Sequence, residues 1–166
     1  MLSTGSVFLY GDSGVCRVQE IRRERFKNRG EQDYYILKPV YRPNATLHVP
    51  ADGDIFARRM RPLLTRDEAQ ALVQDLPGLE TDWISDDKAR AEHFRQVISD
   101  CDRRELLRMV KTVYRRRREL LAMGRRLHSV DEALWHSAEK IVSEEIAFVL
   151  EKEPDGVLKE LFGQTA

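Results

Sequence analysis

The sequence predicts an α+β protein that begins with a small β-barrel or curved sheet and continues as an all-α helical bundle. Apolar and polar residues alternate with a period near two through the first part of the chain, whereas from Thr65 onward apolar residues recur at helical spacing. Gly and Pro turns separate the strand-like runs, and capping residues precede the helix-like ones. We therefore divide the 166 residues into domains 1–64 and 65–166.

Four runs in the first domain are rich in β-branched, aromatic and aliphatic residues and predict strands. Charged residues from Arg22 to Arg29 lead from the second run to Gly30, which is typical of a hairpin end. Short strands joined by tight turns in so small a domain indicate a curved sheet or a small barrel. The predicted strands are Val7–Tyr10, residues 15–21, Tyr34–Leu37 and Thr46–Val49.

Five helix starts are predicted in the second domain. Thr65 with Glu68 forms a capping box, and Pro77-Gly78 ends the helix that it begins. Proline is well tolerated in the first turn of a helix, so Pro154 indicates the start of the last helix. The remaining starts are Ser85 with Asp86 and Asp87, Asp102 with Glu105, and Ser129 with Glu132.

The composition limits the classes of function that are expected for this chain. No apolar run approaches the roughly 20 residues that span a bilayer, and residues 1–5 lack the features of a secretory signal. A cytoplasmic protein without membrane contact is therefore expected. Cys16 and Cys101 have no metal-binding or redox spacing, which predicts that both are buried as small apolar residues.

Nothing in the sequence indicates catalysis. The four histidines do not occur at metal-ligand spacing, and Gly11 and Gly14 lack the lysine of a phosphate loop. The carboxylates of Glu144 and Glu145 occupy adjacent positions and are predicted to lie on a solvated helix surface. We therefore predict no enzyme activity, no metal and no cofactor.

The net charge of zero conceals a basic segment. Residues 103–126 contain ten Lys and Arg but only two Asp and Glu, whereas both flanking segments are acidic. Such a segment is suited to phosphate binding, although pairing with the acidic neighbouring helices would explain it equally well. The candidate DNA-binding residues here are Arg115, Arg116, Arg117, Arg118, Arg125 and Arg126.

Trp83 lies between the Pro77-Gly78 break and the Ser85 cap. It could pack on its own helix as a hydrophobic staple, or it could be an exposed wedge that inserts at a base step in the minor groove. For the second interpretation, the accompanying candidates are Lys88, Arg90 and Arg95. A buried Trp83 would favour a protein without DNA contact, and an exposed Trp83 beside these cations would favour DNA.

Six motifs follow one another along the chain: Tyr10 with Gly14-Val15, Tyr34–Lys38, Leu47–Pro50, Trp83, Leu127-x-Ser129-x-x-Glu132 and Glu144–Ala147. In this order they resemble the CarD/CdnL-type transcription regulators. The family turn usually reads Tyr-Pro-x-His-Gly-Val-Gly, where this chain has Tyr10 to Cys16, and the family usually has Arg or Lys where this chain has His48. A histidine there would make the contact sensitive to pH.

The resemblance implies a Tudor-like five-stranded module that binds the RNA polymerase β subunit, at positions matched here by Arg25, Lys27, Leu47 and His48. It also implies a C-terminal domain at the upstream edge of the promoter −10 element, where Trp83 would wedge into the opening bubble. The protein would stabilise the open complex without sequence-specific contacts, as a monomer located at the nucleoid through polymerase. The alternative is a protein-interaction adapter with no direct DNA binding.

Overall fold

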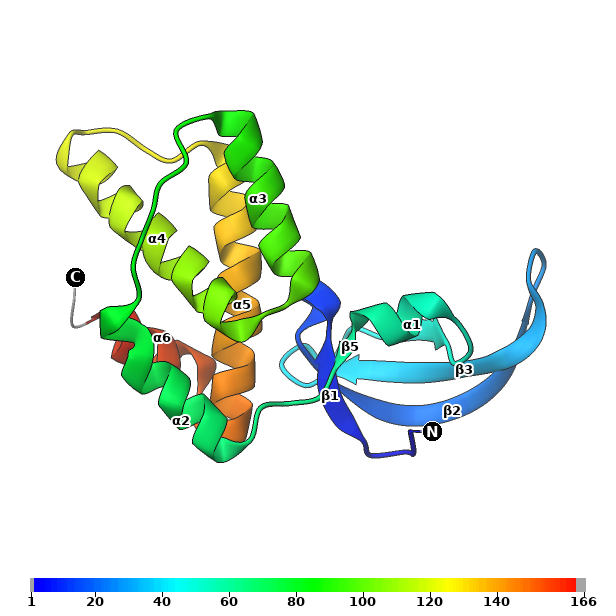
Figure 1. The fold of residues 1–166 in the computed structure, drawn as a ribbon. Coiled ribbons are helices and arrows are strands. Elements are labelled where there is room, and N and C mark those ends of the chain that lie inside the picture. The colour runs from blue at the N-terminus through cyan, green and yellow to red at the C-terminus, as the bar shows by residue number, and fades with distance from the viewer. Residues whose placement is uncertain (1, 164–166) are drawn as a thin grey trace. The chain divides into compact units, whose positions relative to one another are not determined.

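The computed structural model describes residues 2–163 and divides after Leu63 into two compact units (Figure 1). The N-terminal unit contains a five-stranded antiparallel sheet with the strand order β4-β3-β2-β1-β5. Because β4 and β5 are both edges, the sheet is open, and the closed barrel that we considered is wrong for the described residues. The strands are β1 Val7–Tyr10, β2 Val15–Phe26, β3 Gly30–Pro39, β4 Leu47–Pro50 and β5 Met60–Arg61.

Strand β2 is longer than the pattern predicts. The charged segment after Arg22 continues the strand to Phe26, and it pairs with β3 down to the tip pair Phe26↔Gly30. The ladder shifts register between Val18 and Glu20. Such a bulge changes which side chains share a face of the sheet. The alternation of apolar and polar residues that identified the strand therefore stops at the bulge, although the strand itself continues.

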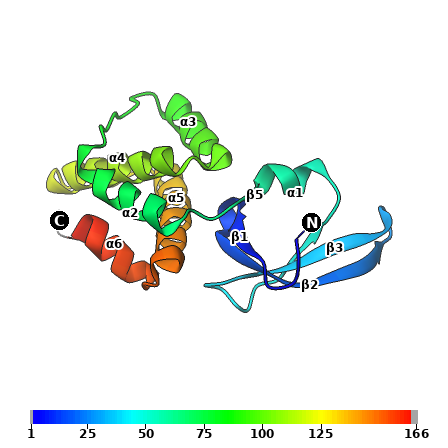
Figure 2. The same ribbon diagram turned by 60° about the horizontal axis from the view of Figure 1, so that its bottom comes forward.

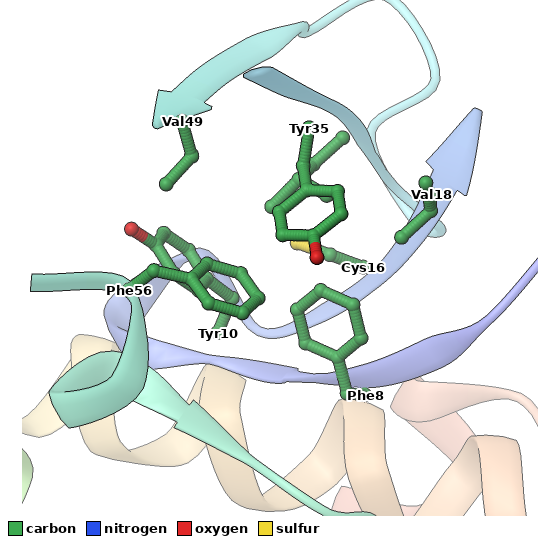
Figure 3. Packing of buried hydrophobic residues seen from close by; sticks show 8 residues of the cluster. Phe8, Tyr10, Cys16, Val18, Tyr35, Val49 and Phe56 are labelled. Carbon is green, nitrogen blue, oxygen red and sulfur yellow. The ribbon is translucent and has the colours of Figure 1, made fainter. Parts of the chain in front are cut away.

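A short helix, α1 Asp54–Arg59, follows β4 and was not predicted. It has no side-chain N-cap, and the residue before it is Gly53 at φ 142°, so it lacks the usual start signal. Its role is to bring Phe56 into the core, where the ring lies 5.8 Å from both Phe8 and Tyr10 and 4.9 Å from Tyr35 (Figure 3).

The C-terminal unit is helical, and α5 contacts each of the other four helices (Figures 1 and 2). In the described part of the chain, none of the helices has the length and apolar character needed to cross a bilayer. Cys101 is buried here and Cys16 in the N-terminal unit, as predicted. The elements are α2 Arg66–Asp75, the 3-10 turn η2 Leu76–Gly78, α3 Asp87–Asp100, α4 Arg103–Ala122, α5 Ser129–Leu150 and α6 Pro154–Phe162.

The capping signals place most helix starts correctly. Thr65 and Glu68 form the reciprocal capping box, and Asp102 accepts a hydrogen bond from the Glu105 amide. The cap of α3 was predicted one residue too early, at Ser85, and the cap of α5 one residue too late, at Ser129. Asp86 caps α3 because its carboxylate accepts from the Ala89 amide. His128 precedes α5, so Ser129 is already the first helical residue.

The prediction of a solvated Glu144–Glu145 surface is wrong, because both side chains are buried. Glu145 is 1% exposed and accepts two hydrogen bonds of 2.9 Å from the Arg103 guanidinium. It also accepts one of 2.9 Å from the Leu64 amide. A buried carboxylate needs such partners. Glu145 therefore joins α5 to the first residues of α4 and to the segment before α2.

Candidate interaction surfaces

The first candidate surface of the N-terminal unit is the β4 edge. β4 pairs with β3 through the register Leu37↔Leu47 to Tyr34↔Pro50, and within residues 2–163 no strand pairs with its other side. Its backbone groups can therefore pair with an incoming strand. On this edge strand His48 is exposed, and its Nδ1 lies 3.1 Å from Glu24 Oε2 on β2.

Beside this edge lies a hollow of about 420 Å³ between the β2–β3 hairpin tip and β4. Phe26 is 44% exposed, and its ring lies 4.9 Å from that of Tyr34. Sequence reasoning missed Phe26, although a large aromatic residue in the middle of a charged run was a usable signal. We call it the hairpin hollow, and its lining residues are Phe26, Lys27, Asn28, Arg29, Tyr34, His48 and Pro50.

Of the four predicted polymerase-binding residues, the structure brings Lys27 and His48 together in the hairpin hollow. Arg25 is exposed on β2 opposite Glu31 of β3 and does not line the hollow. Leu47 is partly buried and packs against the core of the sheet. Leu47 is therefore mainly a packing residue, and its backbone is the part that faces the edge.

In the C-terminal unit, Trp83 lies in the segment between η2 and α3 and is half-buried. The Arg90 guanidinium lies 4.3 Å from the centroid of its ring, and that of Arg116 lies 5.5 Å away. The Phe94 ring meets it edge-on at 6.4 Å. Trp83 thus packs on its own helix, α3, and on α4, while part of the indole remains accessible. Neither full burial nor full exposure, the two outcomes expected to decide its role, is observed.

Arg90 cannot serve as the phosphate contact that we predicted. Its side chain is buried, and its guanidinium donates two hydrogen bonds, of 2.9 and 2.8 Å, to the carboxylate of Asp131. It also donates to Asp87 and to the Ile84 carbonyl. The bonds to Asp131 raise the pKa of Arg90, and Arg90 in turn lowers the pKa of Asp87. Arg90 therefore joins α3 to α5 beneath Trp83.

Lys88 and Arg95 are both exposed on α3. They line a hollow of about 460 Å³ that also contains the carboxylates of Asp87, Glu92 and Asp131. The charge of this hollow is mixed, so it is not a simple anion site.

The arginine tract is partly engaged within the chain. Arg115 donates a 3.1 Å hydrogen bond to Thr81, Arg116 pairs with Glu119 at 3.2 Å, and Arg117 lies 5.5 Å from the ring centroid of Trp135. The ion pair of Arg116 is therefore with a residue of its own helix. Further along the chain, Arg118 is exposed on α4, and Arg125 and Arg126 are exposed in the α4–α5 connection.

Acidic side chains surround Trp83 along the chain. Glu80, Asp82, Asp86 and Asp87 are all exposed. A phosphate backbone near the indole would meet these carboxylates as well as the α4 arginines. The local field is therefore a balance of the acidic segment and the basic helix, and it is weaker than the basic block alone suggests.

No group of three or more His, Cys, Asp or Glu residues suited to a metal ion occurs within residues 2–163.

Comparison with known protein families relates most of the N-terminal sheet to one domain family. Residues 2–55 match the family model of the CarD-like/TRCF RID domain, a segment that spans β1 to β4 and the first residues of α1. The N-terminal unit is therefore an RNA polymerase-interacting domain, which indicates a role connected with transcription. Over this segment the resemblance to the CarD/CdnL type is confirmed. No curated protein matches the chain.

Proposed function

We propose that this chain is a transcription regulator. Its N-terminal unit, a Tudor-like module, binds the RNA polymerase β subunit, and its C-terminal helical bundle makes non-sequence-specific contacts with promoter DNA at the upstream edge of the −10 element. It acts as a monomer and locates to the nucleoid through polymerase. The observation that carries the proposal is the RID domain match over residues 2–55.

The hairpin hollow and the β4 edge support the docking step. An unpaired edge offers main-chain hydrogen bonds to a strand of the partner, and neighbouring side-chain hollows supply specificity. Lys27 and His48 lie together beside this edge, next to the exposed ring of Phe26. A partner strand that pairs with β4 would carry its side chains toward this hollow.

The surface around Trp83 supports the DNA step. Part of the indole is accessible, and Arg116 lies against it. An aromatic surface of this kind gains contact with a base step only when that step has opened. The protein would then bind the melted promoter better than the closed one, and only such a difference in affinity shifts the equilibrium toward the open complex.

The test is the lifetime of the open complex formed by polymerase holoenzyme with the full chain. Trp83→Ala should shorten the lifetime by roughly 5- to 150-fold, because base stacking on an aromatic ring contributes about 1–3 kcal/mol. Polymerase binding should be unchanged. Trp135→Phe, which replaces a buried indole on α5, is the matched control and should leave the lifetime of the open complex unchanged. An unaltered lifetime with the Trp83 variant would overturn the DNA step and leave the docking step in place.

A second candidate, the adapter without direct DNA contact, is favoured by two observations. Four exposed carboxylates flank Trp83, and Arg115, Arg116 and Arg117 have contacts inside the chain. Under this candidate the C-terminal unit binds a protein, and open-complex lifetime does not depend on Trp83.

A further inference from the structure

An apolar cleft of about 240 Å³ opens on the C-terminal unit between η2, α4 and α6. Its apolar lining comes from all three elements. The Tyr114 hydroxyl donates a 3.0 Å hydrogen bond to the Phe162 carbonyl, and the two rings lie 5.1 Å apart, so α4 and α6 are fixed relative to each other. The lining residues are Leu76, Pro77, Lys111, Tyr114, Arg115, Arg118, Leu161 and Phe162.

The charge of this apolar cleft has one sign. Three of its lining residues, Lys111, Arg115 and Arg118, are basic and none is acidic. Lys111 donates to the carbonyls of Leu76 and Leu79, which are dipoles and carry no net charge. Burial and the neighbouring Arg115 lower the pKa of Lys111. Positive charge thus accumulates at the rim of an apolar hollow.

We propose that this apolar cleft is a docking site for an acidic amphipathic segment of a partner protein, with one large apolar side chain in the cleft and flanking carboxylates on Arg115 and Arg118. The volume suits a single leucine or aromatic side chain. Recognition of a helix by anchoring an apolar side chain in a groove is a common mode of peptide binding. This inference is independent of the proposed role of Trp83.

A protein segment fits the apolar cleft better than a nucleic acid does. A base needs an aromatic face on which to stack. The faces of Tyr114 and Phe162 are turned toward each other at an interplanar angle of 36°, and the rest of the apolar lining is aliphatic. Such a surface accommodates a side chain of any apolar shape, while the basic rim selects for carboxylates.

The test measures, by NMR, the binding of two minimal probes to the full chain. The probes are 4-phenylbutyrate and its cationic counterpart 4-phenylbutylamine. The carboxylate should shift the signals of Tyr114, Leu161 and Phe162 saturably, and the amine should not. A helical peptide with one leucine flanked by glutamates should compete with the carboxylate, whereas the same peptide with lysines should not.

The variant Arg115→Glu with Arg118→Glu reverses the charge of the rim, and both changes are on exposed positions of α4. This double variant should weaken the binding of 4-phenylbutyrate at least about tenfold and make 4-phenylbutylamine the better ligand. Arg125→Glu with Arg126→Glu is the control for net charge and should change neither affinity. Equal binding of both probes, no saturable shift in the cleft, or displacement of the carboxylate by an oligo-dT strand would each overturn the proposal.

Discussion

Arg90 and Asp131 form a buried ion pair in the C-terminal unit, with both side chains 3% exposed. Two charges in such a place are stable only because each satisfies the other, so losing one leaves the second buried and unpaired. The pair lies directly beneath Trp83, since Arg90 contacts that ring. The position of the indole therefore depends on this pair.

Asp131→Asn removes one charge of the pair and should lower the free energy of unfolding by about 3 kcal/mol or more, because the Arg90 guanidinium stays buried. Chemical denaturation measures the change, and Trp83 fluorescence in a Trp135→Phe background reports movement of the indole. Asp87→Asn is the matched control, since Asp87 bonds the same guanidinium but is 71% exposed, and its effect should be much smaller. Equal effects of the two variants would contradict the dominant role of burial.

Glu139 on α5 gives a pH dependence of stability. Burial raises the pKa of its carboxyl, and this outweighs the opposing effects of His136 and Arg117. The folded state therefore binds the Glu139 proton more tightly than the unfolded state does. The protonated carboxyl stabilises the fold below the ordinary pKa of 4.5, and this contribution is lost as the pH rises from 4.5 through the raised pKa. Glu139→Gln should remove this loss.

The measurement is the difference in unfolding free energy between Glu139→Gln and the unchanged chain across this pH range. The difference should grow in favour of the variant as pH rises and then level off. A difference that shrinks with rising pH would show that the pairing with His136 and Arg117 dominates over burial.

At the scale of the element, the β2–β3 hairpin tip and β4 act together. Lys27→Glu should weaken binding to the polymerase β subunit by about tenfold, because a reversed charge at the rim of an interface repels the partner surface that the lysine attracts. Surface-immobilised β subunit with the full chain as analyte gives the affinity. Arg23→Glu is the control on the same hairpin, since Arg23 is exposed and pairs with Glu31 outside the hollow.

The same experiment separates Arg25 from Lys27. Arg25→Glu should have little effect if the hairpin hollow is the contact, because Arg25 does not line it. A larger loss from Arg25→Glu than from Lys27→Glu would move the contact to the other side of the hairpin. Leu47→Glu is unsuitable for this purpose, because it places a charge against the core of the sheet and would reduce stability as well as binding.

At the scale of the whole molecule, the zero net charge is divided into basic and acidic segments whose effect on DNA binding depends on salt. If Arg125 and Arg126 each neutralise one phosphate, replacing both with Ala should reduce the slope of log affinity against log salt by roughly 1.8. Replacing Arg116 and Arg117 should change the slope less, since both already contact side chains of the chain. Fluorescence anisotropy with duplex DNA measures both slopes, and two unchanged slopes would favour the adapter.

The sequence by itself determined the division into a sheet and a helical part, the strand cores and most helix starts. These features depend on local causes: alternation, helical periodicity and caps such as Thr65 and Asp102, whose hydrogen bonds span three residues. It also indicated the polymerase-interacting module, because the motifs that carry that resemblance lie close together in the chain.

Only the tertiary structure decided which charged side chains are surfaces and which are interior. Arg90 and Glu145 look like ordinary polar helix positions, yet each is buried against a partner about 40 residues away in the chain, at Asp131 and Arg103. The assembly of Lys27 with His48, and of Tyr114 with Phe162, likewise joins distant segments. Local patterns carry no record of such pairs, because the free energy of burying a charge is set by what the fold places beside it.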